Sequence, residues 1–150
     1  MPTYESIEQE IITQIFHILP TLRSSVLKSK EFSPNSAVQL PHIQVLLSLT
    51  EHSSLTVTQL SRITGIAMPN ITPLLDRLLS LAFISRTPSE QDRRMVFIQV
   101  TESGRAFLKT ILNELSAHLL NEQYNFSPEK LVEIRDAFRV LCDSFLSPVV

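Results

Sequence analysis

The residues best suited to chemistry in this sequence are arginines in its middle third. Residues 54–105 carry six arginines and four acidic residues, a net charge of +2, whereas the whole chain has a net charge of −2. Every basic residue in this stretch is an arginine. A planar guanidinium forms paired hydrogen bonds with a phosphate or a base edge, which a lysine ammonium does not. The pattern favours contact with nucleic acid, although a solvated face with a few arginines also accounts for the charge.

The triplet Asp92-Arg93-Arg94 lies in a polar turn between two segments with the pattern of strands, 83–87 and 95–100. Side chains at such a turn project beyond the body of a domain, and an arginine there can enter a narrow minor groove. We expect Asp92 to orient the guanidinium of Arg94 through a charge-assisted hydrogen bond. The alternative is a local pair that only fixes the turn.

The elements that must position these arginines are two helices that precede the hairpin. Thr56 or Thr58 is suited to cap the first helix, and Gly65 suits the left-handed position that ends it. The second helix is predicted from about 68 to 81, with four apolar residues turned inward: Ile71, Leu74, Leu75 and Leu78. Two helices joined by a short turn containing glycine form a helix-turn-helix, and the hairpin makes it a winged helix.

Long amphipathic helices are predicted on both sides of the winged helix. The first spans about 5–30, is expected to kink at Pro20, and carries an apolar stripe of Ile7, Ile11, Ile15, Ile18, Leu22 and Val26. Ser127-Pro128 is the start signal of the last helix, whose stripe is Leu131, Ile134, Phe138, Leu141 and Phe145. These stripes are too long and too apolar for one small domain to cover, which indicates a second copy of the chain.

The connecting segments complete a mainly α-helical fold with a small β-hairpin wing. Residues 31–39 are predicted to form a polar loop. Pro41 suits the first turn of a short helix, and Thr101 suits the N-cap of the helix that follows the hairpin.

Several functional classes are excluded by composition. Gly65 and Gly104 are the only glycines, so the sequence contains neither a P-loop nor a dinucleotide-binding fingerprint. The GxSxG and HExxH motifs are also absent. We therefore predict no enzyme and no cofactor. The four histidines, at positions 17, 42, 52 and 118, have no ligand spacing, so no metal site is predicted.

The cellular compartment is predicted from the same composition. The single cysteine, Cys142, excludes an intramolecular disulfide, fits a reducing compartment and is expected to be a buried, inert thiol of the last helix. No apolar run reaches 18 residues, and the first residues lack the pattern of a signal peptide. We predict a cytoplasmic protein that is not in a membrane.

In the middle third the sequence resembles the MarR family of winged-helix transcriptional regulators. Four pieces match in order and spacing: Leu55-Thr56-Val57-Thr58-Gln59-Leu60-Ser61, Ile71-Thr72-Pro73-Leu74-Leu75-Asp76-Arg77-Leu78, Asp92-Arg93-Arg94 and Val100-Thr101-Glu102-Ser103-Gly104. The resemblance implies one domain over 1–150, with dimerisation helices in 1–40 and 106–150. The winged helix-turn-helix would span 41–105 and its wing 86–95.

The resemblance also implies a homodimer that binds a pseudo-palindromic operator in double-stranded DNA. Recognition-helix contacts would come from Met68, Asn70, Thr72 and Pro73. Phosphate contacts would come from Ser61, Arg62 and Arg77, and wing contacts from Arg86, Asp92, Arg93 and Arg94. Three positions depart from the family pattern: Ala67 replaces a polar N-cap, Pro73 replaces a longer polar residue, and Ala82 replaces the glycine that ends the recognition helix.

Many relatives bind small aromatic or anionic effectors, which implies a repressor that such a compound releases from DNA. Here an effector crevice would be lined by Phe16, His17, His42, Leu46, Phe107 and Ile111, although ordinary packing also accounts for each of them. The alternative function is a winged-helix protein-interaction module without specific DNA binding, which the net acidic charge and Pro73 would favour.

Overall fold

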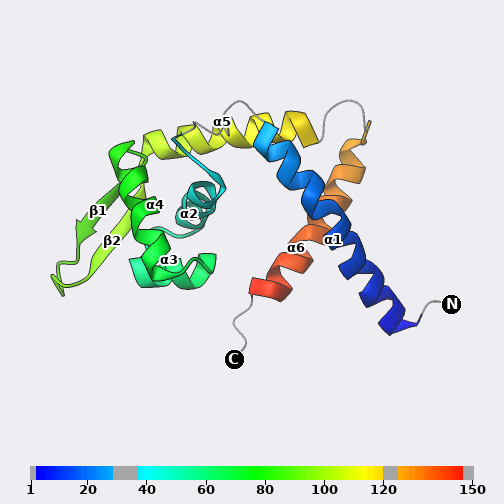
Figure 1. Cartoon of the computed structure of the whole chain (residues 1–150), viewed down its shortest axis with the longest axis horizontal. Coiled ribbons are helices and arrows are strands. Elements are labelled where there is room, and N and C mark those ends of the chain that lie inside the picture. The colour runs from blue at the N-terminus through cyan, green and yellow to red at the C-terminus, as the bar shows by residue number, and fades with distance from the viewer. Residues whose placement is uncertain (1–2, 29–36, 120–124, 147–150) are drawn as a thin grey trace. The chain divides into compact units, whose positions relative to one another are not determined.

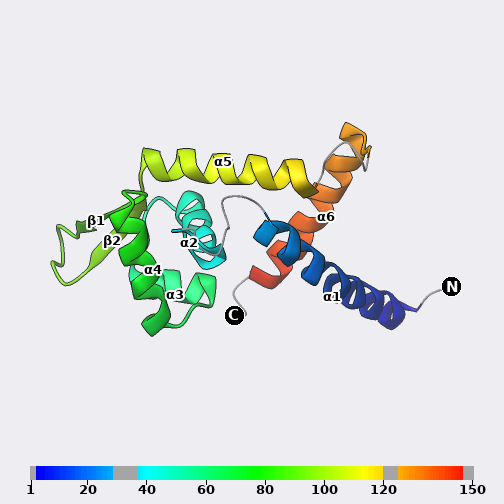
Figure 2. The same cartoon turned by 45° about the horizontal axis from the view of Figure 1, so that its top comes forward.

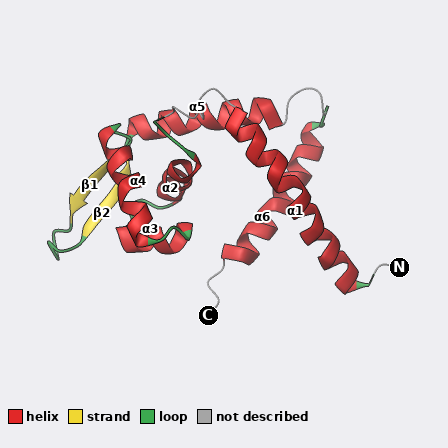
Figure 3. Ribbon diagram, in the orientation of Figure 1, coloured by secondary structure: helices red, strands yellow, loops and turns green. Residues whose placement is uncertain are grey.

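The computed structural model describes residues 3–28, 37–119 and 125–146, which form six helices and a two-stranded antiparallel sheet (Figure 1). The predicted mainly α-helical fold with a hairpin wing is confirmed (Figure 3). In chain order the elements are α1 (Tyr4–Lys28), α2 (Leu40–Glu51), α3 (Val57–Thr64), α4 (Met68–Ser80), β1 (Ile84–Pro88), β2 (Val96–Val100), α5 (Glu102–Leu119) and α6 (Pro128–Leu146). The chain divides into two units, Met1–Leu115 and Ser116–Val150.

The turn between α3 and α4 is built by local hydrogen bonds. Thr56 is the N-cap of α3: its Oγ1 accepts from the backbone N of Gln59 at 3.3 Å, and Gln59 Oε1 accepts from the backbone N of Thr56 at 2.8 Å. This capping box decides between the two threonines considered above. Gly65 ends the helix with a φ of 69°, as predicted. The predicted helix-turn-helix therefore has the expected caps.

Both ends of α4 show the consequences of the two alanines that depart from the family pattern. Ala67 precedes the helix and supplies no side-chain cap. After the helix, Ala82 has a φ of 57°, the left-handed conformation that glycine adopts without strain. Its carbonyl accepts a hydrogen bond from Thr101 Oγ1 at 2.6 Å, which ties this turn to the start of α5. The geometry normally provided by glycine is thus held here by an alanine.

The hairpin pairs Ile84 with Val100 and Pro88 with Val96, and both views show it extending away from α2, α3 and α4 (Figures 1 and 2). Leu55 forms a two-bond bridge with the other edge of β2, donating to and accepting from Ile98 at 3.0 and 2.8 Å. The wing is therefore anchored at its base to the segment that precedes α3.

A single apolar core holds the winged helix together. Its fully buried side chains come from α2, α3, α4, both strands and α5: Val45, Leu46, Leu49, Leu60, Ile71, Leu75, Leu78, Ile84, Ile98 and Ile111. Of the four α4 residues expected to face inward, three are buried and Leu74 is half-buried. Gly104 lies so close to the carbonyl of Phe83 that any Cβ would collide with it, which accounts for glycine there.

The two terminal helices expose much of their apolar surface in the single chain. On α1, Phe16 is 69% exposed, and Ile7, Ile11, Ile12, Ile18 and Leu19 are also exposed. The predicted loop is described only over 37–39, since 31–36 lie outside the described residues, as does the Val26 side chain.

In the second unit, Ser127 caps α6 as predicted, with its Oγ accepting from the backbone N of Lys130 at 3.2 Å. On α6, Phe138 is 54% exposed, and Leu131, Val132 and Val140 are exposed as well. The side chain of Phe145 lies outside the described ones. In the described part of the chain, none of the helices combines the length and apolar character needed to cross a membrane.

Candidate DNA-binding surface

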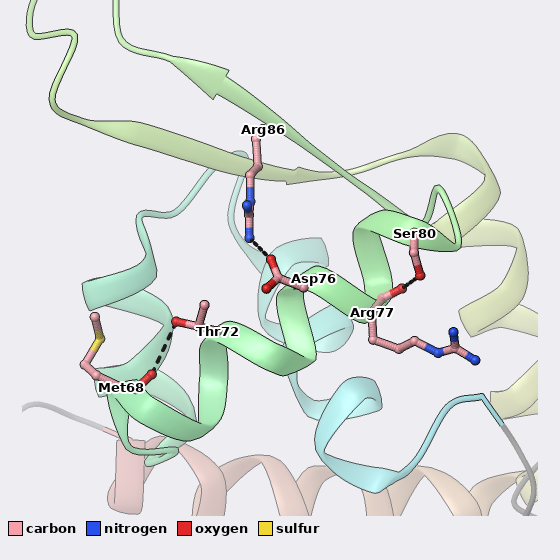
Figure 4. Close-up of polar contacts among 6 residues, drawn as sticks. All are labelled: Met68, Thr72, Asp76, Arg77, Ser80 and Arg86. Atoms are coloured by element: carbon pink, nitrogen blue, oxygen red, sulfur yellow. Dashed lines mark hydrogen bonds and ion pairs between the residues drawn. The ribbon is translucent and has the colours of Figure 1, made fainter.

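The first two turns of α4 present a neutral face. Ile71 and Leu75 have no exposed surface and so define the inner side of the helix. On the other side the predicted contact residues are all exposed: Met68, Asn70, Thr72 and Pro73. Thr72 Oγ1 donates to the Met68 carbonyl at 3.4 Å, and Figure 4 shows these two residues together at the start of the helix. All four predicted residues are therefore accessible to a partner.

Pro69 is a contact candidate that was missed from the sequence. It is exposed, and its spacing of four residues from Pro73 places both rings on one helix face. That spacing was the available signal. The outward face of α4 is thus more apolar than the predicted set implied.

Ser61 and Arg62 of α3 differ in their availability. Ser61 is half-buried, and its Oγ donates to the backbone carbonyl of Ile66 at 2.7 Å. Phosphate oxygens only accept hydrogen bonds, so in this structure Ser61 stabilises the turn instead of offering a phosphate donor. Arg62 is exposed and forms no side-chain hydrogen bond or ion pair with the described residues. Of the two, Arg62 alone offers donors to a phosphate.

Arg77 is directed away from the start of α4. Its Nε donates to the backbone carbonyl of Ala37 at 3.1 Å, and Figure 4 shows the guanidinium pointing away from Asp76 and Arg86. The bond joins α4 to the residues that precede α2. This leaves the two Nη groups of Arg77 for a phosphate.

Arg86 links the wing to the recognition helix. Its Nη2 lies 2.7 Å from Oδ1 of Asp76, and Figure 4 shows the side chain reaching from β1 to α4. The pair neutralises a carboxylate on the exposed side of α4 that would otherwise repel phosphate. Arg86 therefore acts within the protein, a role that the sequence did not reveal because it depends on how β1 lies against α4.

The wing tip corrects the predicted role of Asp92. Its Oδ1 accepts from the backbone N–H of Arg94 at 2.9 Å, and among the described residues it forms no ion pair with the guanidinium. A two-residue spacing closes a local ring to the backbone more readily than it reaches the end of a long side chain. Asp92 thus fixes the turn, while the Arg93 and Arg94 side chains stay exposed and without a partner among the described groups.

The predicted effector residues do not line a common crevice in this structure. Leu46 is 0% and Ile111 is 1% exposed, so neither has surface to offer a ligand. Phe107 is half-buried and stacks on Phe83, with ring centroids 4.5 Å apart. These three side chains pack in or against the core because burial of apolar surface stabilises the winged helix. Phe16 and His17 are exposed on α1.

His42, the remaining predicted effector residue, is a buried capping group of α2. Its Nδ1 accepts from the backbone N–H of Gln39 at 3.0 Å. Burial lowers the pKa of His42 below its usual value of 6.5, and the positive charge of Arg77 adds to this shift. An accepting Nδ1 requires the neutral ring, so the geometry and the pKa direction agree.

Cys142 differs from its prediction, since it is exposed on α6 and not buried. A stripe read from the sequence places it between two apolar residues, but no part of the described chain covers it. Among the side chains that the structure describes, no three His, Cys, Asp or Glu groups come close enough to hold a metal ion.

A winged helix with a projecting arginine-tipped hairpin defines a class of nucleic-acid-binding proteins, and comparisons with known proteins identify the family. Residues 38–96 match the model of the MarR family. The chain is 30% identical over 124 residues to the organic hydroperoxide resistance transcriptional regulator of Bacillus subtilis, covering 81% of this chain and 83% of the relative. The chain belongs to the MarR family of winged-helix transcriptional regulators.

Two further similarities agree with this assignment. The chain is 30% identical over 104 residues to the HTH-type transcriptional regulator YfiV of Bacillus subtilis, a match over 69% of this chain and 65% of YfiV, just under two thirds of that relative. A MarR family protein from Bacillus stearothermophilus shares the fold, with a TM-score of 0.75 at 23% identity over 95% of this chain and 98% of that one.

Proposed function

We propose that this protein is a homodimeric repressor that binds a pseudo-palindromic operator in the cytoplasm. The start of α4 would lie in the major groove of each half-site and the wing in the adjacent minor groove. The observation that carries the proposal is the wing tip, where Arg93 and Arg94 are exposed and unpaired among the described residues, on a turn held by Asp92. Unpaired guanidinium groups on a projecting turn suit an anionic groove.

A homodimer is supported by the exposed apolar residues of the terminal helices. Phe16 on α1 and Phe138 on α6 are 69% and 54% exposed in the single chain. Large exposed apolar surface marks interaction sites, and a two-fold interface covers it with the same surface of a second copy. Two-fold symmetry would also present two winged helices to the two halves of an operator.

Repression would follow from occupancy of a promoter by the dimer. Release by a small aromatic or anionic effector remains a prediction, and residues other than Leu46 and Ile111 would have to line its pocket. The alternative of a protein-interaction module is not favoured, because the relatives matched by this chain are named as transcriptional regulators.

The test is binding of the purified protein to its own upstream DNA and to scrambled DNA across a salt series. Specific binding by a dimer supports the proposal. Because residues 54–105 contain no lysine, we expect a salt dependence that corresponds to fewer than ten phosphate contacts per dimer. Binding no tighter than to scrambled DNA at every salt concentration contradicts it.

The wing is tested by Arg94→Ala, with Arg105→Ala as the matched control. Arg105 is also exposed and unpaired among the described residues, but lies on α5. We expect Arg94→Ala to weaken operator binding by about 1–3 kcal/mol. An equal effect of both substitutions would show that only net charge matters.

A further inference from the structure

We propose that this regulator reads A·T base pairs in both grooves: adenine and thymine through neutral side chains of α4, and a narrow A·T minor groove through the wing. Guanine is not read by α4. This inference rests on the proposed function, since it concerns the same surface and names the DNA sequence class that fits it.

The first two turns of α4 lack the groups that recognise guanine. Guanine presents two acceptors, O6 and N7, in the major groove, and paired donors from arginine or lysine are its commonest contact. Residues 68–75 contain no charged side chain. The one hydroxyl on the exposed face, that of Thr72, donates to the Met68 carbonyl at 3.4 Å. No side chain in these turns supplies two donors from a cationic group.

The charged residues of the third turn are partly engaged and lie beyond the first two turns of the helix. Arg77 donates from Nε to Ala37 and points away from the pair formed by Asp76 and Arg86 (Figure 4). Asp76 could accept from N4 of cytosine, but its Oδ1 is held 2.7 Å from Arg86. Arg77 is nine residues beyond Met68, about 13 Å along the helix axis. The first two turns of α4 therefore hold neither a cationic donor for guanine nor a carboxylate for cytosine.

The same face carries what A·T pairs require. Asn70 is exposed, and its amide has no hydrogen-bonding partner among the described residues. An asparagine amide pairs with both N6 and N7 of adenine. Met68 is 44% exposed, and the rings of Pro69 and Pro73 are exposed as well. These apolar groups suit the C5 methyl of thymine.

The wing tip favours the same base pairs by a different property. A·T tracts have a narrow minor groove with enhanced negative potential, which attracts inserted arginines. Arg93 and Arg94 are adjacent and exposed, and the turn is held by Asp92 Oδ1 and by Ser89 Oγ, which accepts from the backbone N–H groups of Gln91 and Asp92 at 3.2 and 3.3 Å. A fixed turn lowers the entropic cost of placing both guanidinium groups in a groove.

The experiment begins with selection of bound duplexes from a pool of random double-stranded DNA by the full-length protein. The inference expects enriched half-sites with A·T pairs throughout the positions that α4 protects. The selected duplex is then remade with 7-deazaadenine, which lacks N7, or with deoxyuridine, which lacks the thymine methyl. We expect about tenfold weaker binding with the first, and about fourfold for each contacted methyl removed by the second.

Two matched variants assign the adenine contact. Asn70→Ala is expected to weaken binding to the selected duplex by about 5- to 150-fold, and to abolish the sensitivity to 7-deazaadenine. Asn113→Ala removes an exposed asparagine amide from α5 and is expected to retain both the affinity and that sensitivity. Loss of sensitivity in only the α4 variant supports the inference.

The outcomes separate this inference from the proposed function. Enriched half-sites with conserved G·C pairs under α4, or full affinity for the 7-deazaadenine duplex, overturn the A·T inference while leaving a sequence-specific regulator. If no sequence is enriched and every duplex binds alike, the proposed function itself fails.

Discussion

Leu75 in α4 and Phe138 in α6 both lie on the apolar stripe of their helix, yet Leu75 has no exposed surface and Phe138 is 54% exposed. The same contrast separates the two regions to which they belong. The winged helix closes its core within one chain, through α2 to α5 and the hairpin. The terminal helices α1 and α6 leave large apolar side chains uncovered. The winged helix therefore buries its core within the single chain, whereas the terminal helices expose the apolar surface that the proposed homodimer would cover.

The largest effect on stability is expected in the winged helix, whose core is closed within one chain. Leu75→Ala leaves a cavity among fully buried neighbours and should lower the free energy of unfolding by about 2–5 kcal/mol. The measurement is urea unfolding followed by circular dichroism. Leu79→Ala, at a 37% exposed position of the same helix, should cost much less. Comparable losses from the two substitutions would mean that α4 does not close the core as described.

Substitutions on the exposed apolar side of the terminal helices should weaken association of the dimer and leave the core of the winged helix unchanged. Phe138→Ala is expected to weaken the dimer by about 2 kcal/mol, roughly thirtyfold in the dissociation constant, as for a central interface aromatic. Sedimentation velocity over a dilution series measures this. Arg139→Ala, exposed on the next position of α6, serves as the control. A dimer unaffected by Phe138→Ala would place the interface elsewhere.

Two helix ends within the winged helix allow an opposite pair of substitutions. Ala82 and Gly65 have φ values of 57° and 69°. Ala82→Gly relieves left-handed strain and should stabilise the protein by about 0.5–1 kcal/mol, since the relief exceeds the added entropy of the unfolded chain. Gly65→Ala should destabilise it by about 1 kcal/mol. Thermal unfolding at two protein concentrations tests both, and shifts of equal sign would contradict the assigned strain.

The smallest effect expected is a pH dependence of the stability of the winged helix. Because burial lowers the pKa of His42 from 6.5, the unfolded chain binds this proton more readily than the native protein does. Stability from this group is therefore present above pH 6.5 and is lost as the pH falls below it. His42→Gln keeps an acceptor for the Gln39 N–H but does not titrate. Urea unfolding from pH 7.5 to 5.5 should show a shallower decline in the variant, and identical declines would contradict the role of His42.

Much of the fold was predictable because its signals are local. Thr101 accepts from the backbone N of Gly104 at 3.0 Å, and Ser127 caps α6 in the same way. Such bonds join residues three apart, so sequence spacing alone specifies them. The exposure of the predicted contact residues of α4 was predictable for the same reason, since helical periodicity separates an inner from an outer face.

Contacts between elements were less predictable. The pairing of Asp76 with Arg86 and of Arg77 with Ala37 depends on how the hairpin and the residues before α2 lie against α4. Cys142 was expected to be buried but is exposed. The periodicity of an apolar stripe does not say whether a neighbouring element covers it. Leu46 and Ile111 were assigned to a pocket because apolar residues suit a ligand and a core equally well.

The sequence by itself determined the order of helices and strands, the helix caps, the neutral start of the recognition helix and the arginine pair at the wing tip. Each follows from residue type and spacing along one element. Only the tertiary structure decided which guanidinium groups remain available to DNA, since Arg86 is held by Asp76 and Nε of Arg77 by Ala37, whereas Arg62, Arg93 and Arg94 meet no partner among the described residues. An ion pair between elements depends on their packing, and packing is set by the whole core.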